Sequence, residues 1–294
     1  MRFGIMAMQL EALVPTGIPA EQVMANITGF DHAGLVKSLF DRGFNPIELG
    51  GDLSLFLPHT YHPESIERLA ALKAEGVSYT VHLPLWSVEP STPLAPVRKG
   101  SVAAVVQILQ ATQVLDPEVY VLHATGALAA EFYNMKISEL ARTLILGQFQ
   151  NGARESLKAI LAETGLPSRK LAIETIEFPL DLTLELAEEL DLSLCLDTGH
   201  VLAGFPGWLD FFETLERILP RLAEVHLHDS RCMPEGVRGY GEDHKPLGQG
   251  DLDLGRFLDR LAEADFSGPL VFELKLDEAL ESRRVIEATR PQYL

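Results

Sequence analysis

Short apolar runs with β-strand character alternate with longer amphipathic segments along the whole chain. Strands that alternate with helices in this way form parallel β/α units. Nearly continuous apolar strands are expected where helices cover one face and barrel-interior side chains cover the other. We therefore predict an α/β protein built as one closed TIM barrel of eight β/α units. The eight predicted strands are Arg2–Met6, Pro46–Leu49, Val77–His82, Val119–His123, Lys170–Glu174, Leu192–Asp197, Ala223–His228 and Pro269–Glu273.

The segments between these strands carry the start and stop signals of helices. Pro63–Glu75 opens with proline, which suits the first turn of a helix, and it ends before Gly76. Apolar residues at helical spacing also predict helices at Arg154–Thr164, Leu254–Ala264 and Leu276–Ala288. One α/β barrel needs about 250 residues, and this chain of 294 residues has neither a low-complexity linker nor a break in composition. Residues 1–294 are therefore expected to form one domain.

Charge and cysteine content narrow the class of protein. The formal net charge is −18, which disfavours non-specific attraction to nucleic acid. Cys195 and Cys232 are too few for a disulfide framework, and we expect both to be reduced thiols. Met1–Val14 has one basic residue and is interrupted by Glu11, so it does not resemble a signal peptide. No run approaches the ~18 apolar residues of a membrane span, so we expect a soluble, cytoplasmic protein without a membrane partner.

Ionisable side chains stand where the predicted strands end. TIM-barrel active sites are built from the C-terminal ends of the strands and from the loops that follow. The residues at these positions are His82, His123, Glu174, Asp197, His200, His226, His228, Glu242, His244 and Glu273. A lone histidine or acid here is most often a satisfied cap, but six of the nine histidines share this predicted face. The other three histidines (His32, His59 and His62) are expected at the surface.

This combination of residue types indicates a metal site. A carboxylate that closes an apolar strand is costly to bury without a partner, as at Glu174, Asp197 and Glu273. Three carboxylates that converge on one barrel mouth repel one another unless cations lie between them. Imidazoles and carboxylates are the ligands that Zn²⁺, Mn²⁺ and Fe²⁺ prefer. We therefore predict divalent metal ions at the C-terminal mouth of the barrel.

Local spacing refines the roles of some of these residues. Gly199 is expected to let the chain turn so that Asp197 and His200 face one ion. His226 and His228 are two apart on one strand and share a face, and we favour His226 as the metal ligand. His228 is then expected to support the metal site or to contact the substrate.

Other features are less specific. Arg231, Lys245 and Lys275 follow the last two strands and could neutralise a phosphate, with solvated surface charge as the alternative. Turn formation is the favoured role of Gly248-Gln249-Gly250, although a phosphate cradle is the alternative. The proline-rich loop Pro84–Pro96 is either an ordered surface connection or a wall of the substrate pocket, and together with Ser230–Tyr240 it is a candidate specificity element.

With these motifs the chain resembles the xylose-isomerase-like barrels, the superfamily that includes endonuclease IV and many sugar isomerases and epimerases. The resemblance covers nearly the whole chain. It implies a four-ligand metal core formed by Glu174, Asp197, His226 and Glu273. In the epimerases and related isomerases, the residues that match Glu174 and Glu273 also serve as the catalytic acid–base pair.

The endonuclease IV branch has five further ligands and holds three zinc ions. Its two early histidines resemble His82 and His123, and its D-x-x-H motif is completed here by His200. Its D-x-H motif resembles Glu242-Asp243-His244, with glutamate in place of aspartate, so Asp243 could supply the carboxylate instead of Glu242. This resemblance implies two or three divalent ions per chain.

Several segments are similar to the cobamide-remodelling phosphodiesterases of the same superfamily, which cut a phosphodiester in the nucleotide loop of corrinoids. These segments are Tyr79–Leu85, Tyr120–His123, Leu171–Leu180, Leu194–Leu202 and Asp243–Leu247.

The motifs and the resemblance lead to two main candidate functions and to a third that ranks below them. The first is metal-dependent hydrolysis of a phosphodiester in a small molecule, in which clustered cations activate a water molecule and stabilise the leaving oxygen. The second is isomerisation or epimerisation of a sugar or sugar phosphate, with Glu174 and Glu273 moving the proton. The second uses only the four-ligand core, so it ranks below the first. An abasic-site DNA endonuclease ranks lower again, because no Arg- or Lys-rich loop is visible to hold a duplex.

The expected partner is a small-molecule substrate, and the chain could also pair with a second copy of itself as a homodimer.

Overall fold

The strands close into a barrel in which every neighbouring pair is parallel and the order follows the sequence, from β1 to β8 and back to β1. This confirms the predicted TIM barrel. The computed structural model describes residues 1–7, 17, 19–57, 59–232 and 242–294. Most of Met1–Val14 beyond the first strand, and most of Ser230–Tyr240, therefore lie outside the described residues. The strands are β1 (Arg2–Met6), β2 (Ile47–Gly50), β3 (Tyr79–His82), β4 (Tyr120–Leu122), β5 (Leu171–Glu174), β6 (Ser193–Asp197), β7 (Leu222–His226) and β8 (Pro269–Phe272).

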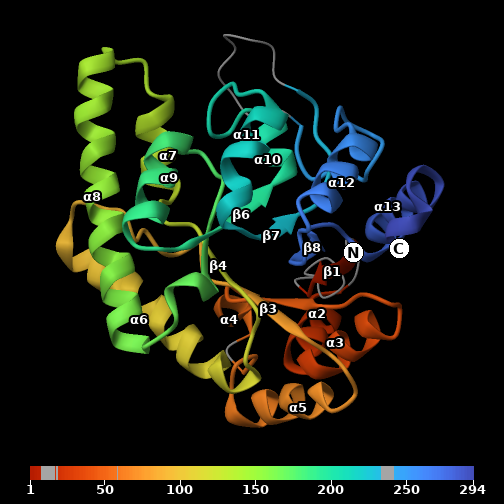
Figure 1. Cartoon of the computed structure of the whole chain (residues 1–294). Helices are drawn as coiled ribbons and strands as arrows, with labels where there is room; N and C mark the ends of the chain where they lie inside the picture. The colour runs from red at the N-terminus through yellow and green to blue at the C-terminus, as the bar shows by residue number, and fades with distance from the viewer. Residues whose placement is uncertain (8–16, 18, 58, 233–241) are drawn as a thin grey trace.

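Helices form a layer around this barrel (Figure 1). The α-helices are α2 (Ala20–Thr28), α3 (His32–Phe40), α4 (Leu53–Phe56), α5 (Pro63–Lys73), α6 (Ala95–Thr112), α7 (Ala127–Asn134), α8 (Glu139–Thr164), α9 (Leu180–Glu189), α10 (Thr198–Leu202), α11 (Phe211–Ile218), α12 (Leu254–Glu263) and α13 (Leu276–Thr289). Short 3₁₀ turns lie at Gln113–Leu115, Ser168–Lys170, Leu219–Arg221 and Pro291–Tyr293. The two termini lie side by side, and the Met1 amino group donates a hydrogen bond to the Tyr293 carbonyl oxygen at 3.1 Å (Figure 1). Among the described residues, no helix is both long and apolar enough to cross a membrane.

Helix α8 is longer than the sequence pattern predicted. It begins at Glu139 rather than Arg154, because the Ser138 side chain caps its first turn by accepting from Ala141 N and the buried face continues through Leu146 and Phe149. Gly152 lies where the helix touches the loop after β3. A Cβ at this glycine would approach the Ser91 carbonyl oxygen to 2.1 Å, so this close contact requires glycine.

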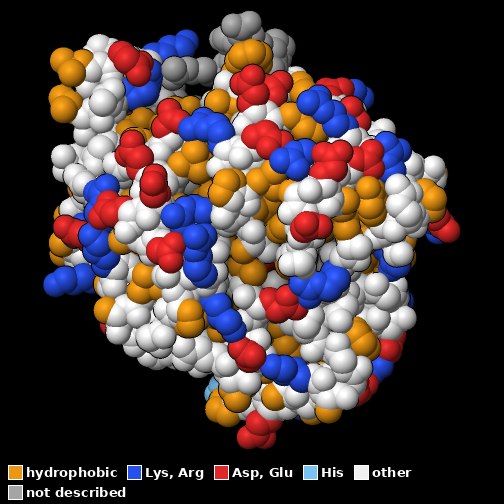
Figure 2. Space-filling model, in the orientation of Figure 1, with side chains coloured by type: hydrophobic (Ala, Val, Ile, Leu, Met, Phe, Trp, Pro, Cys, Tyr) orange, Lys and Arg blue, Asp and Glu red, His pale blue; other side chains and the backbone are white. Residues whose placement is uncertain are grey.

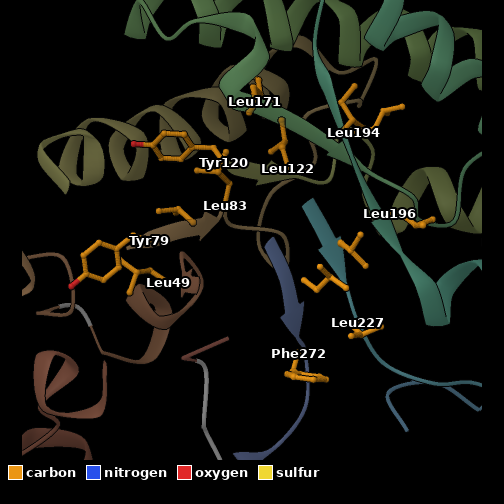
Figure 3. Close-up of a cluster of buried hydrophobic side chains, with 14 of the residues drawn as sticks. Leu49, Tyr79, Leu83, Tyr120, Leu122, Leu171, Leu194, Leu196, Leu227 and Phe272 are labelled. Atoms are coloured by element: carbon orange, nitrogen blue, oxygen red, sulfur yellow. The ribbon is translucent and has the colours of Figure 1, made fainter. Parts of the chain in front are cut away.

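The strands divide their side chains between two environments. Outward residues such as Tyr79, Leu122 and Phe272 join a large apolar core between strands and helices (Figure 3). Inward residues alternate with them, as the two-residue period of a strand requires. A small apolar cluster of Val119, Val121, Ala172 and Cys195 forms part of the barrel interior. The inward positions at the strand ends are thereby directed into the C-terminal mouth.

Candidate metal centre

The barrel mouth brings together nearly all of the strand-end residues selected from the sequence. We call this set the mouth cluster. Its members are His82, His123, Glu174, Asp197, His200, His226, His228, Asp243, His244 and Glu273. Glu174, Asp197, His226 and His228 are at most 1% exposed. Buried side chains from β3 to β8 and from the loop after β7 therefore meet at one place.

Glu174 stands at the centre of one half of the mouth cluster. Its Oε2 lies 3.1 Å from His82 Nε2 and 2.9 Å from His123 Nε2. Its Oε1 lies 3.3 Å from His200 Nδ1 and 3.4 Å from His226 Nδ1. His226 Nδ1 is also 3.4 Å from Glu273 Oε1. Each oxygen of this carboxylate therefore lies near two imidazoles, of which His82, His123 and His226 fit a carboxylate that is shared between cations.

The other half of the mouth cluster is centred on Asp243. Its carboxylate lies 3.4 Å from His200 Nε2, 3.3 Å from His228 Nδ1 and 2.9 Å from His244 Nδ1. His228 Nε2 is 2.8 Å from Asp197 Oδ2, so the two halves are connected through Asp197. The rings of His228 and His244 stack with centroids 4.3 Å apart.

The ring nitrogens show that a positive species belongs between these groups. His82 Nδ1 lies 2.9 Å from the Leu83 carbonyl oxygen, which can only accept a hydrogen bond. Nδ1 must therefore carry the hydrogen, and the Nε2 lone pair points at the Glu174 carboxylate. His200 repeats the pattern, with Nδ1 3.0 Å from the Thr175 carbonyl oxygen and Nε2 facing Asp243. A lone pair that faces a carboxylate requires a proton or a metal ion between them.

The charges of the mouth cluster also shift the pKa values of its members. Burial alone would lower the pKa of His82, but the hydrogen bond and charge of Glu174 raise it to about 9. Burial also opposes the shift at His200, where Asp197 and Glu174 raise the pKa to about 10. Burial would raise the pKa of Glu174, but His123 and His226 hold it well below its usual range. Burial has the same opposing effect at Asp243, where His244 and His228 lower the pKa to about 2.

The donor set fits divalent metal ions. Glu174, Asp197, His226 and Glu273 bring one donor atom each to within 4.8 Å of one another, and so do Asp197, His200, His228 and Asp243. His82, Glu174 and His226 form another such group. Several buried atoms in these groups have no hydrogen-bond partner within the described part of the chain, namely both ring nitrogens of His226, His228 Nδ1 and Asp243 Oδ1. Buried polar atoms without partners are costly, and metal ions would satisfy those that face the centre of the mouth cluster, such as His226 Nδ1.

One predicted ligand does not join the mouth cluster. The Glu242 side chain is 70% exposed and forms an ion pair with Lys245 at 2.7 Å. Asp243 occupies the place that the sequence spacing had assigned to Glu242. The loop from Glu242 to Lys245 turns at His244, which has a positive φ of 52°, so neighbouring side chains point in different directions.

Gly199 has a different role from the one predicted. It lies in the short helix α10, and the Asp197 side chain caps that helix by accepting from His200 N at 2.7 Å. A Cβ at Gly199 would lie 2.1 Å from His228 Cε1. This glycine therefore makes room for the His228 ring. His228 itself belongs to the Asp243 half of the mouth cluster, whereas His226 belongs to the Glu174 half.

The other predicted contacts separate into those inside and those outside the mouth. Lys275 lines the cavity above the mouth cluster. Arg231 is 58% exposed and forms an ion pair with Asp251, outside the cavity lining. Gly248 has φ +83° and donates its backbone N–H to Asp229 Oδ2 at 2.9 Å. This geometry supports the turn interpretation rather than a phosphate cradle, because the N–H group is already used.

The cavity above the mouth cluster has a volume of about 900 Å³. Trp86, from the proline-rich loop, and Phe205 contribute aromatic wall surface, and Trp86 is 50% exposed. The loop is anchored by Glu89, which accepts from Gly126 N at 2.9 Å and from Leu128 N at 3.0 Å. Of the two roles proposed for this loop, the structure supports that of a pocket wall.

Glu48, Glu224 and His32 are buried residues whose placement the sequence analysis did not predict. Glu48 on β2 and Glu224 on β7 are fully buried beneath the mouth cluster. Burial and the neighbouring Glu48 carboxylate raise the pKa of Glu224 well above its usual range. The signal for Glu224 was its position two residues before His226 on the same strand, which gives both the same face. His32 was expected at the surface, but it is 1% exposed between Phe30 and Tyr61.

Comparisons with known proteins agree with this architecture. An uncharacterized protein of Methanocaldococcus jannaschii is 24% identical over 239 residues, which cover 78% of this chain and 76% of that protein. A D-tagatose 3-epimerase-like protein superposes with a TM-score of 0.71 at 20% identity, covering 99% of this chain and 98% of that one. Endonuclease IV from Thermus thermophilus superposes with a TM-score of 0.65 at 20% identity, covering 99% of this chain and 100% of that one. The profile of the xylose isomerase-like TIM barrel family matches residues 36–291, and the chain belongs to that family.

Proposed function

We propose that the protein is a metal-dependent phosphodiester hydrolase that acts on a small molecule. The observation that carries this proposal is the extent of the mouth cluster. His82 and His123 converge on Glu174, and a separate group of histidines converges on Asp243. A single-metal isomerase needs only the four-ligand core, so it gives these additional histidines no role. Two or three ions of zinc, manganese or iron would account for the whole set.

When bound, such ions would polarise the phosphate and supply an activated water molecule. The residues of the chain hold and orient the reacting groups. Glu174 presents one oxygen to each side of the cluster, and it is kept ionised by the imidazoles around it. Among the described residues that line the cavity, Lys275 is the only lysine or arginine, and it would offset the charge of a phosphate. Trp86 and Phe205 would contact an apolar or aromatic part of the substrate.

The size of the cavity and the net charge of the protein favour a small substrate over nucleic acid. The cavity of about 900 Å³ accommodates a ligand larger than a monosaccharide. The net charge is −18, and acidic and basic side chains are interspersed over the face shown in Figure 2. Segments such as Tyr79–Leu85 and Leu194–Leu202 resemble cobamide-remodelling phosphodiesterases, so the nucleotide loop of a corrinoid is the first substrate to assay.

A sugar isomerase or epimerase is the second candidate. Glu174 and Glu273 both lie 3.4 Å from His226 Nδ1, so the four-ligand core is complete and its two glutamates face one space. Under this alternative, Glu174 and Glu273 would move a proton between two carbons of the substrate. The structural neighbours with epimerase names, including 3-keto-D-glucoside 4-epimerase from E. coli, share the fold.

Metal content and one substitution separate the two candidates. We expect the purified protein to hold more than one metal ion per chain by elemental analysis and to cleave bis(p-nitrophenyl) phosphate. His123→Ala should remove about one metal ion per chain and lower cleavage by more than about tenfold. His62→Ala, at an exposed histidine, is the matched control and should change neither. One ion per chain, unchanged by His123→Ala, together with turnover of a ketose, would overturn the hydrolase proposal.

A further inference from the structure

Two carboxylates lie inside the barrel, one layer below the mouth cluster. Glu48 and Glu224 are both 0% exposed. TIM-barrel interiors are normally filled with branched apolar side chains. A buried carboxylate costs several kcal/mol unless a partner satisfies it. These residues are therefore not explained by packing.

Glu48 is held between a donor and a histidine of the mouth cluster. Thr80 donates its hydroxyl hydrogen to Glu48 Oε2 at 3.1 Å. Glu48 Oε1 lies 3.4 Å from His226 Nε2, and neither atom has a hydrogen-bond partner elsewhere in the described part of the chain. The opposite ring nitrogen, His226 Nδ1, is the one that faces Glu174 and Glu273. The His226 ring therefore joins Glu48 to the metal core.

We propose that Glu48 is a positioning residue that accepts a hydrogen bond from Nε2–H of His226 and so directs the Nδ1 lone pair toward the bound metal. A carboxylate that accepts from the distal nitrogen of a metal-bound histidine fixes both its tautomer and its ring orientation. The buried thiol of Cys195 also lies close to the His226 ring, and burial raises its pKa well above its ordinary value, so it stays uncharged. A thiol is a weak acceptor, so Glu48 is the stronger partner. This inference rests on the proposed metal centre.

The first test measures zinc affinity by competition with a chromophoric chelator. Glu48→Ala should weaken zinc binding by about 100-fold, and Glu48→Gln by about tenfold, because glutamine keeps an oxygen acceptor at the same distance. Glu224→Gln is the control, since it replaces a second buried acid in the same layer, and it should bind zinc like the wild type. A cation held between Glu48, Glu224 and His226 would instead make Glu224→Gln as damaging as Glu48→Ala, which would overturn the proposal.

The second test observes the imidazole directly. In the zinc-loaded wild type, ¹⁵N NMR should show a hydrogen on His226 Nε2 and none on Nδ1, and this pattern should be lost or mixed in Glu48→Ala. Wild-type zinc affinity together with an unchanged His226 signal in Glu48→Ala overturns the proposal. If Glu48→Ala does not fold, the same two results in Glu48→Gln overturn it.

These outcomes are distinct from failure of the proposed function. Zinc binding that depends on Glu48 in a protein that does not cleave phosphodiesters would remove the hydrolase and leave the role of Glu48 intact. Phosphodiester cleavage in a protein whose zinc affinity does not depend on Glu48 would leave the hydrolase proposal intact and remove the role of Glu48.

Discussion

Buried histidines occur in two regions of the molecule, and their surroundings give them opposite properties. In the barrel mouth, Glu174 overcomes the effect of burial and raises the pKa of His82 to about 9. In the outer layer, His32 begins helix α3 and stacks near Phe30, and burial lowers its pKa to about 4. Burial alone disfavours the charged imidazole, whereas a carboxylate aimed at the ring favours it. A histidine that belongs to a metal site is therefore recognised by its acidic partners and not by its burial.

The largest effect should come from removing a carboxylate inside the mouth, compared with removing its sequence neighbour outside the mouth. Asp243→Ala removes the group that faces His200, His228 and His244, and it should weaken binding of one metal ion by more than about 100-fold. Glu242→Ala removes an exposed carboxylate that contacts Lys245, and its metal content should match the wild type. Elemental analysis after dialysis against a weak chelator measures both. Equal losses in the two variants would contradict the placement of Asp243 in the mouth cluster.

The outer-layer histidine should affect stability instead. Folded His32 stays neutral down to a pH of about 4, whereas the unfolded chain takes up a proton below its ordinary pKa of 6.5. The unfolded state is therefore favoured as the pH falls from 6.5 toward 4. His32 should lower the free energy of unfolding by roughly 2 to 3 kcal/mol over this range.

Comparison with His32→Phe isolates this effect, because the mouth cluster is the same in both proteins. Urea unfolding of the two metal-free proteins at pH 6.5 and pH 4.5 measures how much free energy of unfolding each one loses between these pH values. We expect the wild type to lose more stability than His32→Phe as the pH falls. Parallel losses would show that His32 does not resist protonation.

The sequence predicted the barrel and the convergence of its strand ends because both follow from local patterns. Apolar runs mark the strands, and parallel strands of a closed barrel must bring Glu174, Asp197 and Glu273 to one rim. The choice between Glu242 and Asp243 depends on the backbone of one loop, which residue spacing does not determine. Glu48 was missed for a different reason. It lies one layer below the rim, and a single acid in an apolar strand gives no indication of what stands opposite.

The protonation of the mouth cluster predicts how metal binding depends on pH. In the metal-free protein, His200 and His244 have pKa values raised to about 10 and 11, because the charges of Asp197, Asp243 and Glu273 outweigh the effect of burial. A metal ion must displace these protons, so zinc affinity should fall as the pH falls, by about tenfold per pH unit for each proton released. Calorimetry of zinc binding in two buffers with different ionisation enthalpies counts the protons. Binding without proton release would contradict the predicted protonation, and His62→Ala should release as many protons as the wild type.

The smallest effect concerns two exposed tryptophans, of which only one lines the cavity. Trp86 is 50% exposed within the cavity lining and packs edge-on against Phe56, whereas Trp208 is 56% exposed outside that lining. An aromatic contact with a substrate ring contributes about 1 kcal/mol, so Trp86→Ala should raise KM for bis(p-nitrophenyl) phosphate about fivefold and leave kcat nearly unchanged. Trp208→Ala removes a similar exposed surface and should change neither constant. A pocket wall that only contacts the substrate stabilises its ground state and transition state alike, so it affects KM and not kcat. A fall in kcat with constant KM for Trp86→Ala would therefore mean that the proline-rich loop acts on the metal centre rather than on the substrate.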